Sequence, residues 1–173
     1  MRLVPLGADL ITTVAGWTAE KANYQWLDFG NGVQILTPAA LNIMAQRPLH
    51  HIRVFMADDE DVPLGVVALS NIDRNFKTAT PWAVLGDKTY RDKHGRRPST
   101  SVALSKLITV GFTELGLESI YAWVVEANVD CLRLVERIQL RYVGRQRRCL
   151  WIDGRPYDRL LFDLLASEHK ELS

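Results

Sequence analysis

Apolar residues in the second half of the chain recur at the three-to-four-residue spacing of a half-buried helix. The residues on this apolar face are Leu104, Leu107, Ile108, Gly111 and Leu115. A short apolar strand over 82–86 precedes them, and a basic loop with many small residues joins the strand to the helix. The pattern therefore predicts a strand, a loop and a helix in that order, and the other predicted elements are arranged around this unit.

Hydrophobic patterning before residue 81 predicts further strands and helices. In chain order they are an edge strand over 2–6, a mostly helical segment over 8–29, a helix over 39–46 and a hairpin with strands over 52–57 and 64–72. Thr37 followed by Pro38 is typical of a helix start, because threonine caps the first turn and proline suits its first position. The acidic run 58–61 is interpreted as the solvated turn of the hairpin and not as a metal site.

Turn and capping residues divide the rest of the chain. Gly116 is placed to end the first helix, and Asn128 is placed to cap the next one. The elements predicted after Gly116 are a strand over 120–125, a helix over 129–140, strand segments over 142–144 and 149–152, and a final strand over 157–165. This order predicts a single domain over 1–173 of the α+β class, an α/β sandwich with helices on both faces of a mixed, mainly antiparallel twisted sheet.

The overall composition is that of a soluble globular protein, with 47% apolar and 24% charged residues. A net charge of +1 gives no global attraction to nucleic acid or to a membrane, and no apolar run approaches the roughly 18 residues of a membrane span. Cys131 and Cys149, the only cysteines, suggest neither a disulfide framework nor a metal site. We therefore expect a cytoplasmic protein with a small-molecule partner and no metal, and a homodimer is left open.

The loop before the central helix has the composition of an anion-binding turn. The first N–H groups of a helix have no partners within it, and the helix dipole makes that end positive. The residues expected to contact the anion of a cofactor are Gly95, Arg96, Arg97, Ser99, Thr100 and Ser101, with Lys93 adding charge. The alternative interpretation is a solvated loop in which a serine or threonine only caps the helix.

Four stretches of the chain resemble the GNAT superfamily of acetyl-CoA-dependent N-acetyltransferases. Residues 111–120 look like that family's helix end and following strand, and NVDCLRLVERIQLRYVGRQRR (128–148) looks like the helix after the strand that binds pantetheine. PLGVVALSNID (63–73) and WIDGRPYDRLLFDLL (151–165) are similar to the third strand and closing hairpin of one branch. That branch contains ribosomal-protein N-terminal acetyltransferases and bacterial amino-sugar acetyltransferases. The resemblance implies the GNAT fold, acyltransferase activity and acetyl-CoA (coenzyme A) as the cofactor.

The chain departs from the family pattern at two points. The family's pyrophosphate loop usually contains glycines, whereas 95–101 contains Pro98 and several hydroxyl residues. Val135 stands where many relatives have a tyrosine that acts as general acid. These differences keep a non-catalytic acyl-CoA-binding module as an alternative function.

The resemblance also implies that the backbones of two diverging strands hold the cofactor. Val84, Leu85 and Gly86 would lie on one side and residues 124–126 on the other, with the Leu85 N–H facing the thioester carbonyl. Asn128 is expected as a further cofactor contact, and its alternative role is that of an ordinary helix cap.

An attacking amine has to lose its proton, and the departing thiolate has to gain one. Glu126 is the first candidate for the general base, followed by Asp73 and Asp87, and the alternative for each is a carboxylate that caps a turn. Cys131 is the candidate for the general acid, and its alternative role is that of a small buried residue.

Two arginines suggest the class of acceptor. Arg145 and Arg147 would share a strand face and suit a diphosphate, which favours a nucleotide-linked amino sugar; the alternative is an edge strand protected by charge. The leading hypothesis is an N-acetyltransferase that moves an acetyl group from acetyl-CoA to a primary amine of a small acceptor by direct attack in a ternary complex. A protein N-terminal acetyltransferase of the ribosomal-protein type is the alternative enzyme.

Overall fold

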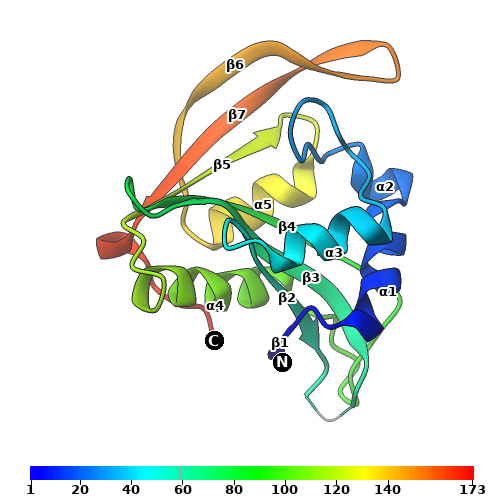
Figure 1. Cartoon of the computed structure of the whole chain (residues 1–173). Helices are drawn as coiled ribbons and strands as arrows, with labels where there is room; N and C mark the ends of the chain where they lie inside the picture. Colours follow the sequence, from blue (N-terminus) through cyan, green and yellow to red (C-terminus); the bar gives the residue numbers. More distant parts are fainter. Residues whose placement is uncertain (59) are drawn as a thin grey trace.

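The computed structural model describes residues 1–58 and 60–173, which form a seven-stranded sheet with helices (Figure 1). The strands are β1 (Arg2–Pro5), β2 (His51–Met56), β3 (Pro63–Asp73), β4 (Thr78–Leu85), β5 (Ser119–Val125), β6 (Arg141–Ile152) and β7 (Arg155–Leu165). The helices are α1 (Ala8–Thr18), α2 (Lys21–Tyr24), α3 (Pro38–Gln46), α4 (Thr100–Thr113) and α5 (Val129–Arg137), and a 3-10 turn covers Ala166–Glu168. Asp59, which belongs to the predicted acidic turn, lies outside the described residues.

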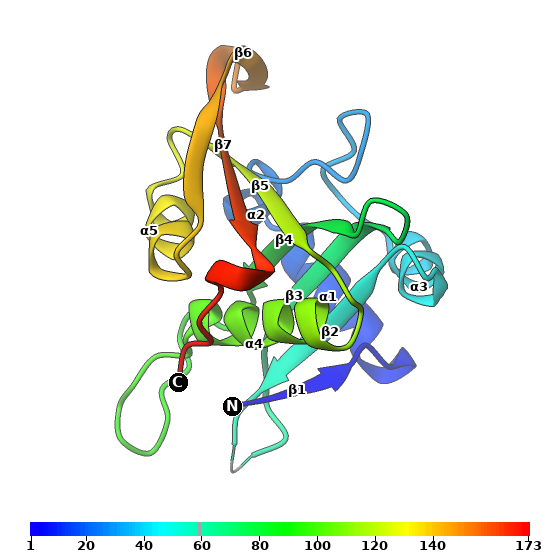
Figure 2. The same cartoon turned by 90° about the vertical axis from the view of Figure 1, so that its left-hand side faces the viewer.

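Helices cover both faces of this sheet, whose strand order is β1-β2-β3-β4-β5-β7-β6. Every neighbouring pair is antiparallel except β4 and β5. Side chains of β3 alternate between the faces, so that Val66 and Ala68 pack with residues of α1 and α3, whereas Val67 and Leu69 pack with residues of α4 and α5. Figure 2 shows α5 and α3 on opposite sides of the strands. The predicted α/β sandwich with a mainly antiparallel sheet is confirmed.

Within the described part of the chain, no helix has the length and apolar character needed to cross a membrane.

Strands β4 and β5 pair only at their beginnings and then separate. Parallel pairing joins 78–79 of β4 to 119–120 of β5. Beyond these residues β4 continues beside β3, and β5 continues beside β7. We call the divergence between 80–85 of β4 and 121–125 of β5 the wedge, and Figure 1 shows β5 rising away from β4. Helices α4 and α5 follow these two strands in the chain, so both helices begin on the wedge's open side.

The hairpin of β6 and β7 extends beyond the body of the sheet (Figure 1). The sequence predicted two separate segments, 142–144 and 149–152, and the structure joins them into one bulged strand, β6. The hairpin tip is attached to α2, because the Lys21 Nζ lies 2.8 Å from a carboxylate oxygen of Asp153. The hairpin therefore arches over the side of the molecule on which α2 lies.

Capping residues identified from the sequence mark three element boundaries. Thr37 Oγ1 accepts the Ala40 N–H at 3.1 Å, and Asn128 Oδ1 accepts the Cys131 N–H at 3.2 Å. Gly116 has a φ of 68°, the left-handed conformation that favours glycine after a helix. These three predictions are confirmed.

The predicted, mostly helical segment 8–29 is divided into two helices, and residues 25–29 at its end are not helical. Glu20 is extended, with φ −71° and ψ 131°, and it separates α1 from the four-residue α2. The carboxylate of Asp28 then accepts the N–H groups of Gly30 at 2.9 Å and Gly32 at 3.1 Å. Such local side-chain bonds compete with helix formation, so the chain continues as an irregular loop to α3.

Substitution of Gly65 tests how tightly β3 packs against its neighbours. A Cβ at this position would lie 2.3 Å from Phe55 Cζ and 2.5 Å from the Val84 carbonyl oxygen. We expect Gly65→Ala to lower the free energy of unfolding by about 1–3 kcal/mol, measured by urea denaturation. Gly16→Ala is the control, because its Cβ would meet nothing within 4 Å and should stabilise α1 by about 0.5–1 kcal/mol. Equal stability of the two variants would contradict this packing.

Candidate functional site

Backbone N–H groups face the wedge from both of its strands. The Gly86 N–H donates to a carbonyl oxygen of β3 at 2.9 Å, and the Glu126 N–H donates to a carbonyl oxygen of β7 at 3.1 Å. Consecutive residues of a strand direct their backbone groups to opposite sides. The N–H groups of Leu85 and Val125 therefore point toward the wedge, where β4 and β5 are no longer paired.

Directly after the end of β4, Gly86 presents backbone without a side chain to α1. A Cβ on Gly86 would lie 2.1 Å from Trp17 Cε2, so the indole ring packs directly on the strand backbone. Val84 is buried, and its side chain belongs to the core between the sheet and α1. Of the predicted residues Val84, Leu85 and Gly86, Leu85 directs its backbone N–H toward the wedge, whereas the Gly86 N–H is bonded to β3.

Helix α4 begins with donors that its own carbonyl groups do not use. Ser99 is the N-cap, since its Oγ accepts the Val102 N–H at 3.3 Å and lies 3.0 Å from the Ser101 Oγ. The first bond of the helical pattern runs from the Ala103 N–H to the Ser99 carbonyl at 3.1 Å. The N–H groups of Thr100 and Ser101 precede it, and such groups suit an anion.

Asp92 organises the basic loop between β4 and α4. Its carboxylate accepts the N–H groups of His94 and Arg96 and the Arg96 Nε–H, each at 2.8 Å. Gly95 closes the turn with a φ of 74° and donates to the Asp92 carbonyl at 2.8 Å. Hydrogen bonds from the Arg96 backbone and side chain, together with that from His94, hold the pKa of Asp92 at about 2. Arg96 is therefore paired, whereas Arg97 is an exposed cation close to the start of α4.

Two of the three predicted bases cap turns. Asp87 follows the end of β4 and accepts the Thr89 hydroxyl and the N–H groups of Thr89 and Tyr90 at 2.7–2.9 Å. These hydrogen bonds lower the pKa of Asp87, which makes it a weaker base. Asp73 accepts two N–H groups of the β3–β4 turn and is paired with Thr78, at the end of β4 remote from the wedge's open side.

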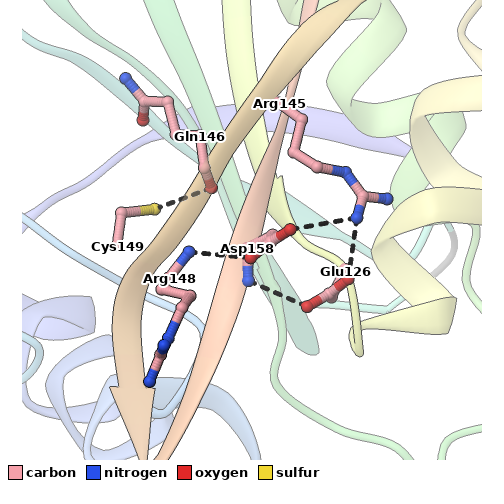
Figure 3. Close-up of polar contacts among 6 residues, drawn as sticks. All are labelled: Glu126, Arg145, Gln146, Arg148, Cys149 and Asp158. Carbon is pink, nitrogen blue, oxygen red and sulfur yellow. Dashed lines mark hydrogen bonds and ion pairs between the residues drawn. The ribbon is translucent and has the colours of Figure 1, made fainter.

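The third predicted base, Glu126, joins β5 to the hairpin (Figure 3). Its Oε1 accepts the Asp158 N–H at 2.9 Å, and its Oε2 lies 3.6 Å from Arg145 Nη1. Asp158 in turn accepts from Arg145 Nη1 at 3.0 Å and from the Arg148 N–H at 2.8 Å. Glu126 therefore holds the first part of β7 beside the end of β5.

Arg145 and Arg147 were expected to share one strand face for an acceptor. The pairing of β6 with β7 shifts between Gln146 and Leu150, and Arg148 has a φ of 50°. The regular alternation of side chains is interrupted by this bulge. Arg145 is bound to the hairpin's own carboxylate, and Arg147 is exposed within the bulge.

Cys131 lies in the first turn of α5, partly buried and packed against the core beneath α4. Burial, with the nearby charge of Asp130, raises the pKa of the Cys131 thiol to about 11. An ordinary thiol has a pKa of about 8.5, so proton transfer from Cys131 to such a thiolate is unfavourable. Asn128, the other candidate beside it, uses its side-chain oxygen to cap α5.

A cavity that no sequence pattern predicted lies between the loop after α2 and the hairpin. It has a volume of about 360 Å³ and is lined by Leu27, Asp28, Gly32, Gln34, Cys149, Leu150, Trp151 and Arg159. Arg159 Nη2 lies 2.9 Å from Asp28 Oδ2, and the guanidinium stacks 4.0 Å from the centre of the Trp123 ring. The local signals were Asp28 before a glycine-rich turn and an arginine among the apolar residues of β7, and neither indicates a partner across the fold.

The two thiols should differ in reactivity. Near pH 8, we expect iodoacetamide to label exposed Cys149 first, because a thiol of pKa about 11 is thiolate in only about 0.1% of molecules. Labelling of Cys131 should accelerate about tenfold per pH unit until its pKa is reached. Peptide mass spectrometry over time measures both rates, with Cys149→Ser as the control. Faster labelling of Cys131 than of Cys149 would contradict the structure.

Comparison with solved structures identifies the fold. The spermidine N-acetyltransferase of Vibrio cholerae in complex with CoA and spermine superposes with a TM-score of 0.79, at 17% identity over 96% of each chain. The ribosomal-protein-S5-alanine acetyltransferase of Vibrio fischeri superposes with a TM-score of 0.74, at 19% identity over 97% of this chain and 94% of that one. No protein-family model and no curated protein sequence matches.

The similar structures are acetyltransferases, and their sheet shares the arrangement described above. The chain therefore has the fold of the GNAT acetyltransferases, the superfamily that its sequence resembles.

Proposed function

We propose that this protein is an acetyl-CoA-dependent N-acetyltransferase that acts on a primary amine of a small acceptor. The observation that carries the proposal is the wedge, where the N–H groups of Leu85 and Val125 face each other across separated strands while α4 presents its N-terminus nearby. The comparisons support the proposal, because the similar structures include enzymes named for acetyl transfer to an amine.

The residues around the wedge fit coenzyme A. Leu85 and Val125 offer strand-like donors to the amides of a pantetheine arm, and Thr100, Ser101 and Arg97 offer donors and charge to a diphosphate. Pro98, which has no N–H, precedes the N-cap Ser99 and so removes no donor from the helix. The loss of the usual glycines is thus compatible with binding. When bound, acetyl-CoA supplies the acetyl group as a thioester.

Within this proposal, the chain's own residues polarise the thioester carbonyl and hold the strands around it in position. The Leu85 N–H would donate to the carbonyl oxygen as negative charge develops on it, an interaction worth about 3–4 kcal/mol where one such donor has been removed. Glu126 would act as a positioning residue, because its carboxylate holds the Asp158 N–H and faces Arg145. An amine with a pKa of about 10.4 must lose a proton before it attacks, and we assign no residue to that step.

The acceptor is the part of the proposal that the structure changes most. A nucleotide-linked amino sugar was favoured by Arg145 and Arg147, but Arg145 is already bonded to Asp158. The similar structures are named for a polyamine and for the alanine of a ribosomal protein. The proposed acceptor is therefore a primary amine of a small molecule.

A thiol-release assay tests the transferase activity. The purified chain is mixed with acetyl-CoA and amines of several kinds: spermidine, amino acids, amino sugars, nucleotide-linked amino sugars and a peptide with a free N-terminus. We expect enzyme-dependent thiol release with at least one amine, together with a product heavier by one acetyl group in mass spectrometry. Binding of acetyl-CoA without turnover of any amine would favour the acyl-CoA-binding module, and no binding would exclude both.

Asp92→Asn tests the basic loop as part of the cofactor site. Loss of the carboxylate removes the acceptor that orders the turn, and we expect this loss of order to outweigh the freed charge of Arg96, so that coenzyme A binds about 3–10-fold more weakly in isothermal titration calorimetry. Asp73→Asn is the matched control, since it also caps a turn but lies at the remote end of β4. Its affinity for coenzyme A should equal that of the unaltered protein. Equal effects of the two substitutions would argue against a role of the loop in binding.

A further inference from the structure

Arg159 is a largely buried cation that lines the cavity between the loop after α2 and the hairpin. Its side chain is 18% exposed, and that of its partner Asp28 is 19% exposed. The ion pair uses Arg159 Nη2, and stacking on Trp123 fixes the plane of the guanidinium. A cation held in this way presents its remaining donors in a defined direction.

The donors of Arg159 exceed the acceptors around it. A guanidinium has five N–H donors in a planar fork. Asp28 Oδ2 accepts one of them, while Asp28 Oδ1 is occupied by the N–H groups of Gly30 and Gly32. Arg159 Nε is buried and has no hydrogen-bond partner among the described residues. A buried charge is stable only when it is well paired, so this guanidinium has capacity for another acceptor.

We propose that the cavity binds an anionic group of the acceptor, a carboxylate or a phosphate, through Arg159. The planar fork of arginine matches either group with two parallel hydrogen bonds. The Gln34 side chain adds a polar group to the lining, and Trp151, which is 62% exposed, forms part of the wall. The volume of about 360 Å³ is within the range of small-molecule sites.

The position of Arg159 places this anion site beside the wedge. Arg159 is paired across the sheet with Val125, whose N–H faces the wedge. Neighbouring strands are about 5 Å apart, so only a short separation lies between the two sites. The inference rests on the proposed transferase function and deepens it: the acceptor is a small amine whose acidic group lies a few bonds from the nitrogen. A polyamine, which has only cationic groups, offers no partner to Arg159.

Matched pairs of amines test the inference and separate the two sources of anion. Alanine is compared with alaninamide for a carboxylate, and glucosamine 6-phosphate is compared with glucosamine for a phosphate. We expect kcat/KM in the thiol-release assay to favour the acidic member of one pair by about 10–100-fold, as for a charge-assisted hydrogen bond. The pair that shows this preference identifies the anion.

Variants of Arg159 assign the preference to this side chain. Arg159→Gln should reduce the ratio of kcat/KM for the acidic amine to kcat/KM for the neutral amine to about one. Arg159→Lys should retain only part of this preference, because lysine lacks the planar fork of donors. Arg74→Gln is the control, because Arg74 is an exposed arginine beside the β3–β4 turn, and this substitution should leave the kcat/KM ratio unchanged. Thermal unfolding of each variant checks its folding, and Arg159→Lys carries the test if Arg159→Gln does not fold.

Two results would overturn the inference. One is equal or better turnover of the neutral amine in both pairs, and the other is an unchanged ratio in the folded Arg159 variants. If no amine is acetylated, the transferase proposal fails separately, and calorimetric titration of alanine and glucosamine 6-phosphate then tests the anion site directly. Binding that is weakened in Arg159→Lys would support the site, and the absence of binding by the unaltered protein would overturn it.

Discussion

The separation of β5 from β4 is the constraint on which the other functional features depend. Each strand keeps a partner on its far side, β3 for β4 and β7 for β5, so the sheet remains continuous while its centre opens. Backbone donors that face the opening are costly to bury without partners. Water or a ligand with peptide-like groups must therefore fill it, and the helices that follow the two strands bring their positive ends to the same place.

Local signals in the sequence predicted most of the elements and several details of the loop. Asn128 caps α5 as predicted, and Ser99, which was expected to contact an anion, caps α4, the alternative role that the sequence left open, because a short polar side chain suits the first turn. The strand before the basic loop and the apolar face of α4 also follow from periodicity. Prediction was weaker where a side chain captured nearby backbone groups, as Asp28 does in the loop that replaces the end of the expected helix.

Contacts between distant residues could not be predicted, and they decide the roles of the charged residues. Glu126 and Asp158 meet across two strands, and Arg159 meets Asp28 across 131 residues of chain. A single sequence carries no signal of such pairs. The bulge in β6 also depends on a contact between strands, because the Arg148 N–H within it donates to the carboxylate of Asp158 on β7. The arginine that the structure makes most suitable for an anion is therefore on the strand opposite the one that the sequence suggested.

Because Gly86 has no side chain, the Trp17 ring contacts the backbone directly after the end of β4. A rigid bicyclic ring lies on one side of this main chain, and the Leu85 amide that borders the wedge is its immediate neighbour in the chain. A tilt of α1 would move the Trp17 ring, and the ring would displace the backbone of Gly86 and the neighbouring Leu85 amide, because no side chain separates the ring from this backbone. The position of α1 and the position of the backbone beside the wedge are thus coupled through Trp17.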